Sequence, residues 1–278
     1  MNNVFDIKRF WKYLCWDVRN AYNNFGLGFL ICSLLPAIAF VLTFLGTLVF
    51  NPSRFAVTEI TMLIGDSTKI VMIFTAILIT GIVFPARQYG SLTDRKAGST
   101  WLMLPASTLE KFLSILLVTC VVVPLCLAVM LYAFDAVMSL VPYYGQRAFP
   151  LIIDTVRSAM DNLQASDVSV DVNLPYIIYL GFCKFILVYT LGALFFRKHK
   201  IAKTILVLIG LSFVMTALLS VGFFHGMTFT SYDVEAYFAS LDVDKLPVYF
   251  NVVLNVANLL VFALLDLGIY FRIKTLKH

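Results

Sequence analysis

Six long apolar runs constrain this chain more than any other feature of its sequence. They cover residues 27–50, 70–86, 112–134, 176–196, 204–224 and 248–271. A helix needs about 20 apolar residues to cross the hydrocarbon of a bilayer, so each run predicts one transmembrane helix. The chain is 60% hydrophobic and only 13% charged, whereas a soluble domain carries about 25% charged residues. We therefore expect an all-α, polytopic membrane protein, and we exclude soluble, disordered and disulfide-scaffold classes.

The basic residues predict the orientation of these helices. The segment before the first run, the loop 87–111, the turn 197–203 and the tail after residue 271 hold 15 of the 21 lysines and arginines. Because cytoplasmic loops carry the excess of basic residues, we place these segments and both termini in the cytoplasm. The net charge of +5 then reflects topology, so the sequence implies no nucleic-acid partner. Residues 27–278 form one six-span transmembrane domain in this interpretation.

Residues 4–25 predict an amphipathic helix before the first span. At 100° per residue, its apolar side chains fall within one arc of about 140°: Val4, Ile7, Phe10, Trp11, Leu14, Cys15, Val18, Ala21, Tyr22 and Phe25. We expect residues 1–26 to form a helix that lies in the cytoplasmic interface, with its basic residues reaching anionic lipid. The pattern fits both a simple membrane anchor and an elbow helix that couples a cytoplasmic partner to the first span.

The cytoplasmic loop 87–111 holds the clearest local signals. Ser107 followed by Glu110 is a capping box, which predicts that the third span begins at this point. Pro105 ends any preceding helix, because the residue before a proline avoids the α region. Residues 94–104 are long enough for one short helix on the cytoplasmic surface.

The outer loops are acidic. In the loop 135–175, residues 151–163 are amphipathic but too short to span a bilayer, so they predict a surface or re-entrant helix. The loop 225–247 is moderately apolar, and a re-entrant helix pair and a plain surface loop both fit it.

Two ionisable residues fall inside spans, where such residues are usually functional or paired. A rise of 1.5 Å per residue separates Lys184 from Asp266 by about 13 Å along the membrane normal, which argues against a direct ion pair. Asp266 would otherwise contact cytoplasmic water or a basic neighbour. A polar stripe along the last span fits both interhelical glue and a substrate path: Asn251, Asn255, Asn258 and Asp266. Pro36 and Pro124 predict kinks whose freed carbonyls must find donors on neighbouring helices.

The sequence carries no catalytic motif that we recognise. Its histidines, His199, His225 and His278, fall in three separate segments, and the five cysteines include no C-x-x-C pair. There is no H-E-x-x-H, no G-x-S-x-G and no P-loop. We therefore expect no catalytic residue, cofactor or metal site, and any ATP hydrolysis would belong to a separate subunit. An intramembrane enzyme of unknown type is the third and weakest alternative.

The loop 87–111 also carries a resemblance. Its residues Asp94-Arg95-Lys96-Ala97-Gly98-Ser99-Thr100, then Leu104-Pro105-Ala106-Ser107 and Glu110-Lys111, resemble the loop between spans two and three in permease subunits of ABC-2-type transporters. Those permeases also have six spans and an N-terminal amphipathic helix. The Leu-Pro-Ala-Ser-x-x-Glu-Lys version is similar to uncharacterised permease-like membrane proteins of Bacteroidetes-type bacteria.

The resemblance implies a function, a partner and a location. It implies an exporter in the bacterial inner membrane, in which this loop forms a coupling helix that docks on a separate ATPase subunit. The residues that would form or orient this contact are Asp94, Arg95, Lys96, Gly98, Thr100, Pro105, Glu110 and Lys111. It also implies a second permease chain, as a homodimer or a sister subunit. A non-transporting accessory or assembly protein is the alternative from a different class.

Overall fold

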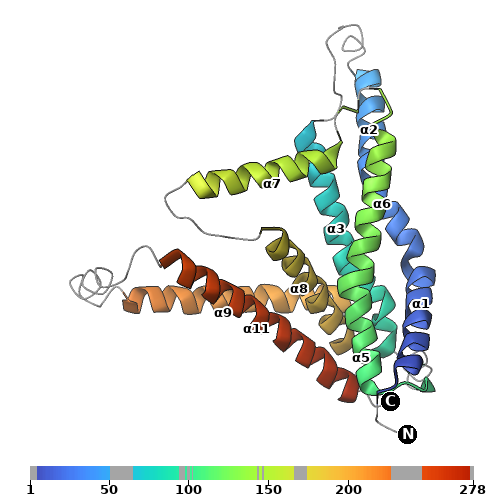
Figure 1. The fold of residues 1–278 in the computed structure, drawn as a ribbon, viewed down its shortest axis with the longest axis vertical. Coiled ribbons are helices and arrows are strands. Elements are labelled where there is room, and N and C mark those ends of the chain that lie inside the picture. The colour runs from blue at the N-terminus through green and yellow to red at the C-terminus, as the bar shows by residue number, and fades with distance from the viewer. Residues whose placement is uncertain are drawn as a thin grey trace.

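The computed structural model describes residues 5–50, 65–93, 98, 101, 103–142, 144–145, 147–165, 174–226 and 246–275. Within these residues every regular element is a helix (Figure 1). The elements are α1 (Ile7–Ser33), α2 (Leu35–Phe50), α3 (Asp66–Gln88), the 3-10 turn η2 (Gly90–Thr93), α5 (Thr108–Leu117), the π-helical turn η3 (Val118–Val122), α6 (Val123–Met138), α7 (Ala148–Ala165), α8 (Leu174–Phe195), α9 (Lys200–Gly226) and α11 (Leu246–Thr275). The predicted all-α class is confirmed for this part of the chain.

Several of these helices are long and apolar enough to cross a membrane. Five such segments are Asp66–Thr93, Thr108–Met138, Ile178–Phe195, Lys200–Leu218 and Asn255–Thr275, and the bent pair α1–α2 gives a sixth if it counts as one span. The chain is therefore a multi-pass membrane protein with five or six candidate spans, in agreement with the apolar runs of the sequence.

The first predicted span is bent. α1 runs without a break from Ile7 to Ser33, so it continues through residue 26, where we placed the end of the interfacial segment. The axes of α1 and α2 differ by 41° across Leu34. Pro36 lies in the first turn of α2 and cannot donate a backbone hydrogen bond to the preceding turn. The predicted kink at Pro36 is confirmed.

Around Pro124 the helix departs from regular α-helical geometry. The preceding turn, η3, is π-helical. A proline has no backbone N–H, so Pro124 cannot donate a hydrogen bond to the carbonyl of Cys120, four residues earlier. Two groups of α8 approach this carbonyl instead: the Tyr179 hydroxyl donates to it at 2.6 Å, and the Cys183 thiol lies 3.8 Å from it. A neighbouring helix therefore satisfies the freed carbonyl, as the sequence predicted.

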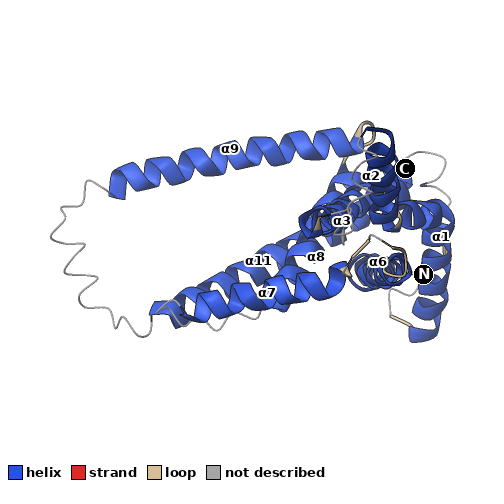
Figure 2. Cartoon of the chain, turned by 90° about the horizontal axis from the view of Figure 1, so that it is seen from above, coloured by secondary structure: helices blue, strands red, loops and turns tan. Residues whose placement is uncertain are grey.

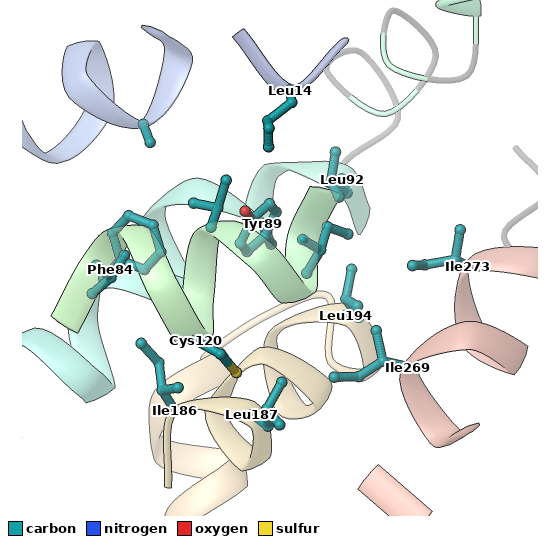
Figure 3. Close-up of a cluster of buried hydrophobic side chains, with 14 of the residues drawn as sticks. Leu14, Phe84, Tyr89, Leu92, Cys120, Ile186, Leu187, Leu194, Ile269 and Ile273 are labelled. Carbon is teal, nitrogen blue, oxygen red and sulfur yellow. The ribbon is translucent and has the colours of Figure 1, made fainter. Parts of the chain in front are cut away.

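The main hydrophobic core lies at the end of the molecule where α1 begins and α11 ends (Figure 1). The core takes side chains from α1, α3, η2, α5, η3, α6, α8 and α11 and from Trp101, and Figure 3 shows some of them. The helices diverge from this end, and α9 leaves the others on its own when seen from above (Figure 2). Only 6% of the most apolar stretch of α9 and 11% of that of α11 are buried, against 50% of the corresponding stretch of α8. These two helices expose apolar faces that suit lipid.

Toward the opposite end, the beginning of α7 lies against α3 and α6, and the rest of the helix points away from them (Figures 1 and 2). The amphipathic stretch 151–163 is helical, as predicted. It lies within the longer helix α7, which is not among the helices that are long and apolar enough to cross a membrane. The carboxylate of Asp135 in α6 contacts the first turn of α7. It accepts hydrogen bonds from the backbone N–H groups of Ala148 and Phe149 at 3.1 and 3.3 Å. The same carboxylate accepts from the Tyr144 hydroxyl at 3.0 Å. Burial, and then the charge of Asp135, raise the pKa of Tyr144.

Candidate functional site

The loop 87–111 is attached to α1 at both of its ends. We call this attachment the α1–loop junction, and its residues are Arg9, Tyr13, Asp17, Gln88, Tyr89, Trp101, Glu110, Lys111 and Ser114. Each contributes a polar contact among α1, the end of α3, the loop and the first turns of α5.

Asp17 is the centre of the junction. Its side chain is buried, and its carboxylate accepts hydrogen bonds from Ser114 Oγ at 2.8 Å, Gln88 Nε2 at 3.1 Å and Tyr89 Oη at 3.3 Å. Because burying a carboxylate without donors is unfavourable, these three contacts make the burial possible. One side chain of α1 thereby joins the end of α3 to the beginning of α5.

Gln88 is held at two points of α1. Its Nε2 donates to Asp17, while its Oε1 accepts from Asn24 Nδ2 at 2.9 Å. The amide thus bridges two turns of α1 and is fixed in one orientation, because donor and acceptor are both used. The start of the loop cannot shift along α1 without breaking both hydrogen bonds.

The end of the loop is attached through Glu110. The capping box is confirmed: Glu110 N–H donates to Ser107 Oγ at 3.2 Å, and Ser107 N–H donates to Glu110 Oε2 at 2.9 Å. The same buried carboxylate pairs with the Arg9 guanidinium, at 2.6 Å from Nη2 to Oε1 and 2.8 Å from Nε to Oε2. It also accepts from the backbone N–H of Asp6 at 3.0 Å. Glu110 therefore begins α5 and fastens it to the N-terminus of α1.

Trp101 is the buried anchor of the loop itself. Its indole N–H donates to Tyr13 Oη at 2.8 Å. Its backbone carbonyl accepts from Lys111 Nζ at 3.0 Å, and the same ammonium lies 4.4 Å from the centre of the indole ring, which is cation–π geometry. Trp101 thus lies between α1 and α5 and connects both to the loop.

The residues predicted to contact a partner divide into two groups. Asp94, Arg95, Lys96 and Thr100 lie outside the described residues. Of the others, Gly98, Glu110 and Lys111 are buried, and Pro105 is exposed. Glu110 and Lys111 make their contacts within this chain, so their place in the structure is to orient the loop.

The polar stripe of the last span lies partly against α8. Lys184 Nζ donates a hydrogen bond to Asn258 Oδ1. Asp266 lies eight residues further along α11, about 12 Å at 1.5 Å per residue, which agrees with the argument against a Lys184–Asp266 pair. Asn255 is half-buried, and the side chain of Asn251 lies outside the described part. The Lys184–Asn258 contact is an interhelical hydrogen bond of the kind that joins helices in membranes.

Two further basic residues donate to backbone carbonyls near the ends of helices. Lys200 Nζ donates to the carbonyl of Gly90 just after α3. Arg272 Nε donates to the carbonyl of Leu194 at 3.0 Å, and its guanidinium lies 5.0 Å from the Phe195 ring. Cations at these positions satisfy carbonyls that the helix leaves without donors.

The sequence pattern did not reveal Asp17 as a site residue. On the helical wheel it lies about 20° from Phe10, at the border of the apolar arc. The buried face of α1 is rotated toward that border: Phe10 and Phe25 are buried, whereas Trp11 is 63% and Tyr22 74% exposed. An acidic residue beside an apolar arc is the signal that would have found it.

Known proteins provide no assignment for this arrangement. No protein-family model, no curated protein and no solved structure matches the chain. Among the described residues, no three His, Cys, Asp or Glu side chains converge where a metal ion could bind. The functional argument therefore rests on the residues and their geometry.

Proposed function

We propose that this chain is the membrane-spanning permease component of an ABC-2-like, ATP-driven exporter of the bacterial inner membrane. It would couple to a separate ATPase subunit through the cytoplasmic loop 87–111. The observation that carries the proposal is the α1–loop junction, which fastens both ends of this loop to α1. A push on the loop would therefore move α1, α3 and α5 together.

Separating the loop from α1 at the junction would cost a large free energy, so the junction can transmit force. Hydrogen bonds to a buried charge contribute about 1.5–3 kcal/mol each, and Asp17 accepts three of them. Breaking the junction would also leave a buried carboxylate without donors, which is more costly than losing the bonds alone. Closure of the partner ATPase would thus displace the helices as one body rather than pull the loop away from them.

The bend in the first span gives that displacement a direction. α1 carries the junction, and α2 continues beyond the 41° bend toward the opposite end of the molecule. The exposed side of α1 includes Trp11 and Tyr22 beside Lys8, Lys12 and Arg19, a composition that suits the headgroup region. We place the part of α1 before residue 27 in the cytoplasmic interface, as an elbow between the ATPase and the first span.

Two further elements of the proposal follow from the resemblance to ABC-2 permeases. A second permease chain would complete the transporter, and substrate would move between the two. The exposed apolar faces of α9 and α11 supply membrane-facing surface for lipid or for this second chain.

Co-purification with candidate ATPases tests the proposal. Arg95→Glu and Gly98→Trp alter the loop, and Lys198→Glu makes the same charge reversal at an exposed position of the α8–α9 turn. We expect the two loop variants to reduce ATPase association or turnover, and Lys198→Glu to leave both unchanged. An ATPase that binds equally well to all variants with unchanged turnover would instead favour the accessory protein.

A further inference from the structure

One oxygen of a half-buried carboxyl group in α11 lacks a hydrogen-bond partner. The Oδ1 atom of Asp266 is buried and accepts no hydrogen bond. The residue belongs to the apolar stretch Asn255–Thr275, which is long enough to cross a membrane. Leu264 and Leu267 on either side are more than half exposed, so in the membrane lipid borders this part of α11. Water is scarce in such a place.

Three cations on α11 and the helices packed against it are engaged elsewhere. α11 packs against α8 and α5. Lys184 of α8 donates to Asn258. Lys111 of α5 donates to the Trp101 carbonyl, and Arg272 of α11 donates to the Leu194 carbonyl. The ion pairs among the described residues join Arg9 to Glu110 and Lys69 to Asp66, and neither includes Asp266.

The remaining ionisable groups around Asp266 are weak donors. A charge on its carboxyl would act on the thiols of Cys120 and Cys183, and thiols donate only weakly. The Tyr179 hydroxyl is used by the Cys120 carbonyl. The titratable and charged groups on the elements packed here are Glu110 and Lys111 of α5, Cys120 of η3, Tyr176, Tyr179, Cys183, Lys184 and Tyr189 of α8, and Tyr270, Arg272 and Lys274 of α11.

A carboxylate in hydrocarbon without donors or a cation neutralises rather than stays charged. A metal ion would need several oxygen ligands, and no such cluster occurs among the described residues. We propose that Asp266 is a proton-binding site, and that its carboxyl is protonated in this conformation at neutral pH. The proton would leave only when movement of α11 brings water or a cation to the carboxyl. Proton binding and helix movement are thereby coupled, whether or not the chain is an exporter.

The test measures protonation directly, in the full chain reconstituted in lipid. Infrared spectra at neutral pH should contain the C=O stretch of a protonated carboxyl, and this band should disappear in the isosteric Asp266→Asn. Dicyclohexylcarbodiimide, which reacts with protonated carboxyls in membranes, should label Asp266. Labelling should fall about tenfold for each pH unit above the point at which the proton is lost.

Asp135 is the internal control, because two backbone N–H groups stabilise its carboxylate, and it should label many-fold less than Asp266. Asp266→Glu should retain the label, which separates loss of the carboxyl from loss of the fold. Three results would overturn the proposal: no protonated-carboxyl band attributable to Asp266, no labelling of Asp266 at neutral pH, or labelling abolished by Na⁺ at constant pH, which would indicate a metal-cation site.

Discussion

The side-chain amide of Gln88, in the last turn of α3, donates a hydrogen bond of 3.1 Å to the carboxylate of Asp17 in α1. This contact joins residues 71 positions apart at the point where the loop 87–111 begins. Together with the Arg9–Glu110 ion pair at the other end of the loop, it attaches both ends of the loop to α1.

Replacing Asp17 should destabilise the protein strongly. Asp17→Ala leaves the donors of Gln88, Tyr89 and Ser114 buried without an acceptor, at about 1–3 kcal/mol for each group. We expect a loss of several kcal/mol, seen as a lower midpoint of thermal unfolding in detergent. Asp154→Ala, on an exposed position of α7, should change the midpoint little. Equal midpoints for the two variants would show that the junction does not stabilise the fold.

The two partners of the Arg9–Glu110 pair should not be equivalent. Glu110→Ala removes the ion pair, the capping box and the acceptor of the Asp6 N–H, whereas Arg9→Ala removes the ion pair and leaves the capping box in place. Glu110→Ala should therefore lower the unfolding midpoint more. Ser107→Ala isolates the cap and should cost about 1 kcal/mol. If Arg9→Ala lowered the unfolding midpoint as much as Glu110→Ala, the additional contacts of Glu110 would not contribute to stability.

Tyr179 and Pro124 should be coupled. Tyr179→Phe removes the hydroxyl that serves the Cys120 carbonyl and should cost about 0.5–1.5 kcal/mol. Pro124→Ala restores a backbone N–H that can reach the same carbonyl, so Tyr179→Phe should cost less in that background. A double-mutant cycle of thermal stabilities measures this difference. Strictly additive effects would mean that the proline is not the reason for the Tyr179 contact.

Gly192 should be irreplaceable while Thr204 is present. A Cβ atom at position 192 would collide with the Thr204 side chain, so Gly192→Ala should push α9 away from α8 and lower stability. Thr204→Ala removes the colliding atoms beyond Cβ and should rescue much of the loss. The comparison requires the thermal midpoints of the two single variants and the double variant. Absence of rescue would place the defect elsewhere in α8.

Local and lipid-driven features of this fold were predictable from the sequence. The capping box depends on residues three apart, and the apolar runs depend only on bilayer thickness. The donors near Pro124 follow from the rule that no carbonyl stays unsatisfied in lipid, although the rule does not name Tyr179.

The junction was not predictable, because lipid and protein both accept apolar side chains. The pattern of α1 therefore identified an apolar arc but not which part of it faces α3 and α5. Phe10 packs in the core while Trp11 is exposed, and only that rotation brings Asp17 inside. The register of α11 on α8, set by Lys184 and Asn258, likewise depends on tertiary packing.

The most direct measurement is a photo-cross-link from the loop to the ATPase. A photoreactive amino acid at position 95 should form a covalent adduct with a co-purified ATPase subunit, and its yield should change on adding ATP. The same amino acid at the exposed position 153 of α7, on the opposite side of the membrane in this proposal, should give no adduct. An ATPase that co-purifies but cross-links from position 153 and not from position 95 would contradict the proposal.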